Sequence, residues 1–133
     1  GDVEMKIGDS LSVSIVVGEQ DLARTIGSGD VAVLATPRMA ALMEEAAQKL
    51  AKAGLDEGET TVGASVSVEH TAATPPGMRV TATAVLTAVE GKRLTFEMRA
   101  EDDCGVVGTG TQVRVIVGKD KFERRAADKL KNA

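Results

Sequence analysis

The sequence predicts an α+β fold in which one long helix packs against an antiparallel sheet of about five strands. Apolar residues recur at steps of three and four in residues 37–53, which is the period of an amphipathic helix. Apolar and polar residues alternate in five other segments, which is the period of strands with one buried face. Most of these segments follow one another directly, which favours antiparallel neighbours.

Length and composition indicate one domain. The chain has 133 residues, of which 43% are apolar and 27% are charged, as in ordinary globular domains. It contains two Phe and no Trp or Tyr, so the core must consist mainly of Val, Leu, Ile, Met and Ala. We expect a single domain over residues 1–133, with a charged C-terminal tail from about residue 119.

Charge and hydropathy disfavour several classes of partner. Sixteen basic and twenty acidic residues leave a net charge of −4, whereas nucleic-acid binding requires a basic face. No apolar run approaches the roughly 18 residues of a membrane span, and no secretory signal pattern opens the chain. We expect a cytoplasmic protein that binds neither nucleic acid nor membrane. The single Cys104 agrees with a reducing compartment.

The N-terminal part of the chain predicts a strand and a lid. Residues 9–17 alternate polar and apolar side chains, as in a half-buried strand. Residues 18–30 lose this pattern and are rich in Gly and polar residues, which indicates a loop or a broken helical turn. Mobility in this loop would let it act as a lid. Residues 31–35 form a short apolar run.

The long helix is predicted to run from about Pro37 to Ala53, with Thr36 as its N-cap and Gly54 capping its end. Its apolar stripe should pack on the sheet and consists of Met39, Leu42, Met43, Ala46, Leu50 and Ala53. Glu44 lies beside the stripe, about 80° around the helix axis from Thr36. Thr36 and Glu44 are therefore expected to border one crevice.

The strand after the helix carries the only histidine. Residues 61–70 alternate, with one face expected to contain Val62, Ala64, Val66, Val68 and His70. His70 thus lies on the apolar side. Gly63 falls on the opposite face, although a bulge near Gly63 would turn its backbone toward a ligand.

Three more strands are expected, over residues 79–89, 93–101 and 106–117. Gly108 and Gly110 are interpreted as bulges, and Arg114 shares a face with Gln112. The tail from residue 119 is charged and is expected to form a short exposed helix. Because one helix covers only one face of such a sheet, we expect a homodimer to complete the core and the site.

Each candidate residue also has a purely structural interpretation. His70 at a strand end is more often structural than catalytic, although histidine is the side chain that exchanges protons most readily at neutral pH. Glu44 is explained as a solvated flank and Arg114 as a surface or cross-strand charge. Cys104 lies in a polar turn, with a Cys-His nucleophilic pair as its alternative. One His and one Cys are too few for a metal site, so none is expected.

Three stretches together resemble the fluoroacetyl-CoA thioesterase family. They are VEHTAATPPG at residues 68–77, VEGKRL at residues 89–94 and ATPRMAALME at residues 35–44. The resemblance extends from about residue 5 to about residue 125. It implies a hot dog fold, in which a sheet wraps a long helix and two subunits pair to form acyl-thioester sites at their interface.

The resemblance also implies site residues. Thr36, Glu44 and His70 match the family's catalytic positions, Gly63 matches the glycine whose N–H faces the thioester carbonyl, and Arg114 matches the arginine of the last strand, which we assign to substrate binding. In the implied reaction His70 is the general acid and base, while Thr36 or Glu44 attacks the carbonyl or positions water. No cofactor is implied, since coenzyme A enters as part of the substrate.

Substrate preference is the point at which this sequence departs from the family. The fluoroacetate-specific member has a phenylalanine six residues before the threonine, where this chain has Asp30. Fluoroacetyl-CoA specificity is therefore not implied, and we expect hydrolysis of a short acyl-CoA. Two alternatives stay open: a non-catalytic acyl-thioester binding protein, and a hot dog hydratase or dehydratase. The second lacks its usual helix histidine, because residues 37–53 contain none.

Overall fold

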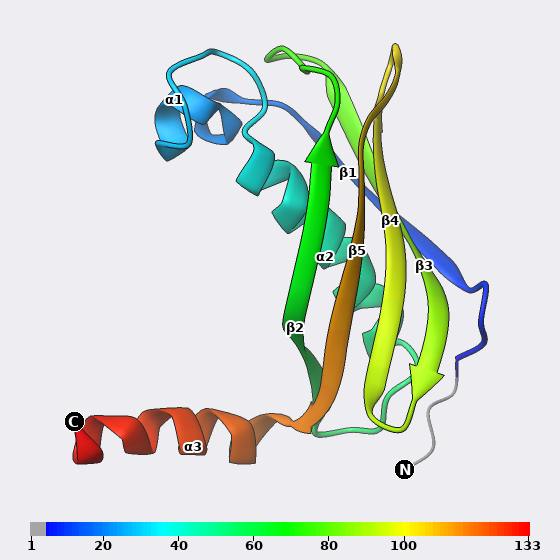
Figure 1. Ribbon diagram of the computed structural model, residues 1–133, viewed down its shortest axis with the longest axis vertical. Helices are drawn as coiled ribbons and strands as arrows, with labels where there is room; N and C mark the ends of the chain where they lie inside the picture. The colour runs from blue at the N-terminus through cyan, green and yellow to red at the C-terminus, as the bar shows by residue number, and fades with distance from the viewer. Residues whose placement is uncertain (1–4) are drawn as a thin grey trace.

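The computed structural model describes residues 5–133, which form an antiparallel sheet around one long helix (Figure 1). The strands are β1 (Ser10–Val16), β2 (Glu59–His70), β3 (Arg79–Glu90), β4 (Arg93–Asp102) and β5 (Gly105–Gly118). Their order across the sheet is β1-β3-β4-β5-β2, and all neighbours are antiparallel. The predicted α+β class and the hot dog arrangement are confirmed.

Helix α2 (Thr36–Lys52) supplies one half of the core. Its stripe is buried against the sheet and consists of Met39, Leu42, Met43, Ala46, Ala47, Leu50 and Ala51. On the sheet, Leu86 and Phe96 are fully buried beside the small side chains of Ala82, Ala84 and Ala100. Burying one Leu or Met side chain contributes roughly 1.5–3 kcal/mol. This mainly aliphatic core therefore holds helix and sheet in a fixed register.

The ends of α2 differ from the prediction. Ala35 is the extended N-cap residue, Thr36 is the first helical residue, and no side chain caps this end. The prediction of Thr36 as N-cap is therefore wrong, and its hydroxyl is available to another partner. The helix ends at Lys52 with Ala53 as its C-cap. Gly54 does not adopt the left-handed conformation of a capping glycine.

The predicted lid contains two short helical turns, η1 (Glu19–Asp21) and α1 (Ala23–Ile26). Its two ends are fixed, because Leu22 and Leu34 form an isolated β-bridge and both side chains are buried. The tip between them is exposed to solvent. Residues 19–35, called the lid segment below, are thus a surface loop held at its base.

A bulge at Ala64 corrects the predicted faces of β2. Gly63 pairs with Arg114 and Ser65 pairs with Val113, which leaves Ala64 as an extra residue. Residues opposite one another in an antiparallel pair point to the same side of the sheet. Because Arg114 faces α2, Gly63 faces α2 as well, so the prediction that Gly63 falls on the face opposite His70 is wrong. Val62, its neighbour in the strand, therefore does not share the face of His70 as predicted.

Gly108 and Gly110 are not the predicted bulges. Both pair regularly with β4, and the extra residue of this strand is Val107. These glycines instead permit close packing. A Cβ on Gly110 would lie 2.7 Å from the Ser67 carbonyl oxygen, and one on Gly108 would overlap the buried Met39 sulfur.

We expect Gly108→Ala to destabilise the protein by about 1–3 kcal/mol, because the added methyl overpacks the core. The new Cβ would meet Met39 and also lie 3.0 Å from the Glu69 carbonyl oxygen. Urea denaturation measures the change in the free energy of unfolding. Gly118→Ala is the matched control, since a Cβ there meets no atom within 4 Å. Equal stability of the two variants would contradict this account.

The sheet has two open edges within residues 5–133, formed by β1 and β2. Strand β2 carries no charged side chain from Thr60 to Val68, and residues 63–67 are exposed. Such an edge lacks the charges and prolines that usually prevent pairing with another chain. Beyond β5, helix α3 (Lys119–Asn132) has no buried residue, as predicted for the tail. None of the described helices has the length and hydropathy needed to cross a bilayer.

Candidate active site

The structure brings Thr36 and His70 together. His70 is the last residue of β2 and Thr36 is the first residue of α2. The Thr36 Oγ1 lies 2.8 Å from the His70 Nδ1, within hydrogen-bond distance. A purely structural role as N-cap would have occupied the threonine hydroxyl at the helix end. Its contact with the imidazole is instead the arrangement in which a base orients or activates a hydroxyl.

A pocket of about 370 Å³ opens over this pair. Ser28, Gly29 and Val31 of the lid segment line one side, and Thr36, His70 and Ala72 line the other. The His70 Nε2 is buried and has no hydrogen-bond partner within residues 5–133. A buried nitrogen without a partner is costly for stability. Its position beside a pocket is suited to binding a substrate atom or a water molecule.

Burial lowers the pKa of His70 below its ordinary value of 6.5, and the Ala72 backbone offsets this effect only in part. Desolvation disfavours the charged imidazolium, so the ring stays neutral to more acidic pH. A neutral imidazole can accept a proton, which is what a general base requires. The environment of His70 therefore keeps a neutral imidazole, able to accept a proton, available below pH 6.5.

If His70 is the general base that the resemblance implies, kcat/KM should fall on the acidic side with a midpoint below 6.5, because it would then report protonation of His70 in the free enzyme. The stability of the folded protein should also decrease toward acidic pH. The unfolded chain takes up this proton at the ordinary pKa, so the free energy of unfolding decreases as pH drops below 6.5. A pH–rate profile checks the first expectation, and an acidic midpoint at or above 6.5 would contradict it.

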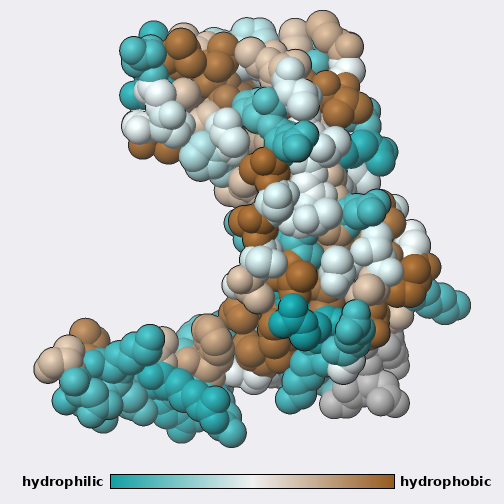
Figure 2. Space-filling model, viewed as in Figure 1, coloured by the Kyte–Doolittle hydropathy of each residue, from teal (hydrophilic) through white to brown (hydrophobic). Residues whose placement is uncertain are grey.

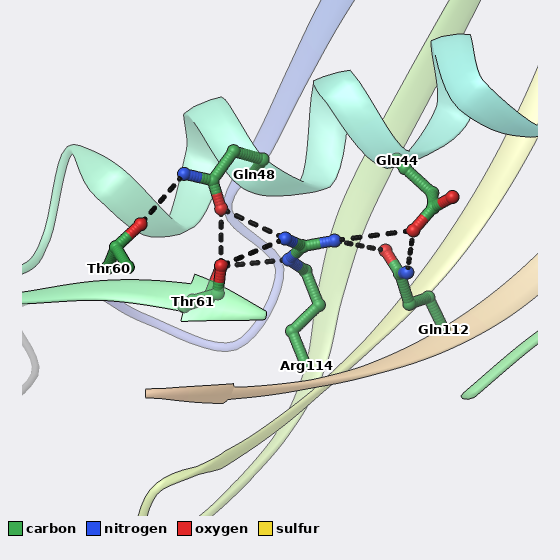
Figure 3. A network of polar contacts seen from close by, with 6 residues as sticks. All are labelled: Glu44, Gln48, Thr60, Thr61, Gln112 and Arg114. Carbon is green, nitrogen blue, oxygen red and sulfur yellow. Dashed lines mark hydrogen bonds and ion pairs between the residues drawn. The ribbon is translucent and has the colours of Figure 1, made fainter. Parts of the chain in front are cut away.

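A second polar cluster lies along α2 at Glu44 (Figure 3). The Gln112 Nε2 donates a 2.6 Å hydrogen bond to the Glu44 Oε2. The Arg114 Nη1 lies 3.6 Å from the same oxygen and donates a 3.1 Å hydrogen bond to the Gln112 Oε1. One carboxylate oxygen is thus held by two side chains of β5. Glu44 is fixed in orientation rather than free at the helix flank.

Arg114 is buried beneath Glu44. Its Nε donates to the Thr61 hydroxyl at 2.8 Å, and its Nη2 donates to the Gln48 Oε1 and the Thr61 carbonyl, both at 3.1 Å (Figure 3). Burial lowers the pKa of Arg114, and the Glu44 carboxylate opposes this change. The guanidinium thus supports the carboxylate from inside the protein. Direct contact between Arg114 and a substrate stays a prediction.

Gly63 borders the same carboxylate. A Cβ at this position would lie 2.9 Å from the Gln112 Nε2 and 3.1 Å from the Glu44 Oε2. The space beside Glu44 is therefore available only because residue 63 has no side chain. The bulge at Ala64 brings this backbone to the helix side of the sheet. Gly63 and Glu44 are neighbours, as their proposed roles require.

The five predicted site residues thus form two groups in one copy of the chain. Thr36 and His70 line the pocket, whereas Glu44, Gly63 and Arg114 are not among its lining residues. Thr36 and Glu44 are separated by about 12 Å along the axis of α2. The expected common crevice is therefore not formed by the lining of this pocket.

Several supporting residues were not predicted as site residues. Gln112 is 1% exposed and directly orients Glu44. The sequence could have indicated this residue, because Gln112 is a polar residue on the inward face of a strand that is rich in β-branched residues. At the base of the lid segment, the Arg38 Nε donates a 2.8 Å hydrogen bond to the Asp21 Oδ1, and the Asp21 Oδ2 accepts from the Gly18 N–H.

The turn after His70 is held by β4 and β5. The Thr71 N–H donates a 2.7 Å hydrogen bond to the carbonyl of Val107, the bulged residue of β5. The buried Thr74 hydroxyl donates a 2.9 Å hydrogen bond to the Asp102 Oδ2. These bonds fix where β2 ends and so where the imidazole lies. Cys104 is exposed in the adjacent β4–β5 turn.

Metal binding has no support among residues 5–133, in which no three His, Cys, Asp or Glu side chains gather in a suitable cluster. The polar side chains that line the pocket are instead the hydroxyls of Ser28, Thr36 and Thr71 and the imidazole of His70. Such groups serve proton transfer and oxyanion stabilisation.

The known proteins that are similar to this chain include several thioesterases. The fluoroacetyl-CoA thioesterase of Streptantibioticus cattleyicolor is 41% identical over 97 residues, which cover 73% of this chain and 70% of that protein. The solved structure of the fluoroacetyl-CoA thioesterase FlK matches with a TM-score of 0.88 and 34% identity, covering 94% of this chain and 97% of that chain. A thioesterase superfamily member from Thermus thermophilus matches with a TM-score of 0.87 and 32% identity, covering 96% and 97%.

The family profile described as fluoroacetyl-CoA-specific thioesterase matches residues 17–120. This range contains the lid segment, α2, the whole of β2 to β5 and both polar clusters. The resemblance seen in the sequence is thus confirmed over most of the chain. The chain belongs to the fluoroacetyl-CoA-specific thioesterase family.

Proposed function

We propose that this protein hydrolyses short acyl-CoA thioesters to the free acid and coenzyme A. The observation that carries the proposal is the 2.8 Å contact between the Thr36 hydroxyl and the His70 imidazole beside an open pocket, in a chain whose relatives are thioesterases. One solved complex of FlK contains acetyl-CoA. A short acyl thioester is therefore the substrate class to test.

In the proposed reaction an oxygen nucleophile bonds to the thioester carbonyl carbon, and negative charge develops on the carbonyl oxygen. The Gly63 N–H stabilises this oxyanion. When water or the Thr36 hydroxyl attacks, His70 removes its proton and transfers that proton to the sulfur as the carbon–sulfur bond breaks. Attack by the Glu44 carboxylate releases no proton, so the sulfur then leaves as the thiolate, and His70 removes the proton of the water that hydrolyses the acyl-enzyme. Water supplies the second oxygen of the acid product. The nucleophile is either water positioned by Thr36 and Glu44, or one of these two side chains followed by water.

The active unit in this proposal is a homodimer formed along the open edge of β2. Antiparallel pairing of two β2 strands places the His70 end of one strand beside the Glu59 end of the other. The Thr36 and His70 group of one copy then approaches the Glu44 and Gly63 group of its partner. This arrangement accounts for the separation of the two groups within one chain. Sedimentation at several concentrations measures the association.

Substrate preference follows from the lid segment. Asp30 is exposed between Gly29 and Val31, which both line the pocket. A carboxylate near the mouth disfavours a purely apolar acyl group, because its desolvation is costly. Residue 30 therefore offers the fluorinated acyl group no apolar contact.

The experiment is a panel of acyl-CoAs that includes acetyl-CoA, fluoroacetyl-CoA and longer chains, assayed for release of free thiol. We expect release from at least one short acyl-CoA. Binding without release from any member would reject the thioesterase proposal in favour of a non-catalytic acyl-thioester binding protein. Hydration of an enoyl-CoA without thiol release would instead indicate a hydratase.

A further inference from the structure

Helix α3 extends away from the rest of the chain (Figure 1). It is held at its start, where the Lys119 N–H donates a 3.0 Å hydrogen bond to the Gly58 carbonyl, and none of its residues is buried. Its length is about 21 Å at 1.5 Å per residue. An isolated helix of about this size is only marginally stable in water, because helical stability in proteins comes mostly from packing. A packing partner is therefore expected.

One side of α3 is suited to such packing. Phe122, Ala126 and Leu130 follow one another at steps of four and form an apolar stripe. Phe122 is 43% exposed and Leu130 is 84% exposed. Lys119–Glu123 and Lys131–Asp128 ion pairs lie along the same helix. The stripe is thus an exposed apolar surface, suited to contact with a partner, on a helix that has no buried residue.

The charge of α3 favours an acidic partner. Residues 119–133 contain six Lys or Arg and three Asp or Glu, a net charge of +3. With −4 for the whole chain, residues 1–118 carry −7. Opposite charges attract and select the partner during association. Residues 1–118 of a second copy of this chain carry the negative charge that such a partner needs.

The shape of the molecule indicates where a second copy would lie. The lid segment and α3 project on the same side as the open edge of β2, so the outline is hollowed between them (Figure 2). Gly118, next to the start of α3, pairs with Glu59 at one end of β2, and the lid segment lies at the His70 end. A copy paired antiparallel along β2 would bring its own lid segment to α3.

We propose that α3 of each copy packs its apolar stripe on the lid segment of the second copy. The lid segment offers two exposed apolar side chains for this contact, Ile26 at 43% and Val31 at 53% exposure, beside the acidic Asp30. The contact rests on the homodimer of the proposed function. Through this contact, called the clamp below, α3 extends across the dimer and covers the lid segment beside the pocket of the second copy.

The first test measures association in the full-length chain by sedimentation over a dilution series. Leu130→Glu should raise the dimer Kd roughly ten- to a hundred-fold, because a charge replaces a buried Leu. Lys131→Gln is the control, since it lowers the charge equally from outside the stripe and should change Kd much less. An unchanged Kd in Leu130→Glu, or equal effects of both substitutions, would overturn the proposal.

The second test locates the contact by hydrogen exchange of the unmodified protein. Amides of α3 and of the lid segment should be protected in the dimer, and both should lose protection on dilution to the monomer. Rapid exchange of α3 in the dimer would overturn the clamp. Protection of α3 that survives dilution would show that α3 packs within one copy of the chain. Protection that appears only with anionic lipid vesicles would show that it binds a membrane surface. Either result would overturn the proposed contact. Thiol release, measured separately, tests the enzyme activity.

Discussion

Replacement of His70 by alanine is expected to lower kcat for acyl-CoA hydrolysis by roughly 10²- to 10⁴-fold, which is the usual contribution of general acid–base catalysis. The variant loses both the proton acceptor and the 2.8 Å contact with the Thr36 hydroxyl. KM should change less, because the proton is transferred during the reaction and not on binding. Steady-state kinetics with the best substrate of the panel measures both constants.

His70→Asn separates the two roles of the histidine. The asparagine amide can occupy the position of the Nδ1 and keep a hydrogen bond to Thr36, but it has no basic nitrogen. We expect its kcat to be as low as that of His70→Ala, while its stability stays closer to that of the parent. If His70→Asn keeps most of the parent kcat, the histidine only orients Thr36 and the general-base assignment is wrong.

Gly63→Ala keeps the backbone N–H but should displace it or the Glu44 carboxylate, and kcat is expected to fall by up to roughly 10²- to 10³-fold, the usual effect of losing one oxyanion donor. Its new methyl would meet the Gln112 Nε2 at 2.9 Å and the Glu44 Oε2 at 3.1 Å. Gln112 is buried and bonded to Arg114, so it cannot move away easily. Either the Gly63 backbone or the Glu44 carboxylate must shift, and both shifts damage the site.

Gly118→Ala is the matched control for this variant, because it adds the same methyl group at a position with open space. It should keep the parent kcat. The free energy of unfolding of Gly63→Ala should also be measured, since strain in the Glu44 cluster lowers stability. Normal turnover in a stably folded Gly63→Ala protein would remove Gly63 and its neighbours from the chemistry.

The elements of the fold could be predicted because they follow from local periods. The stripe of α2 and the alternation in β3 to β5 each repeat within one segment, and both appear in the structure. The sequence predicts a bulge near Gly63 and the bulge is found at Ala64, but no local period could fix its exact position. Its position depends on how β2 pairs with β5, which are far apart in the sequence.

The candidate site was predictable only in part, and from a different source than the fold. The family resemblance indicated His70, Thr36 and Glu44, and the structure supplies the contacts that decide how they meet. Thr36 has the composition of an N-cap, yet tertiary packing starts the helix at Thr36 itself and directs its hydroxyl to His70. The role of Gln112 is likewise set by its neighbour on α2, which no local pattern reveals.

The extra residue in β2 also changes which side of the sheet Gly63 and His70 face relative to each other. Gly63 and His70 are seven positions apart, and an odd separation in a regular strand sends two residues to opposite sides of the sheet. The single inserted residue reverses this parity, so the proposed oxyanion donor and the proposed base both face α2. Deletion of Ala64 would restore regular alternation and turn one of them away, even though neither residue had been changed.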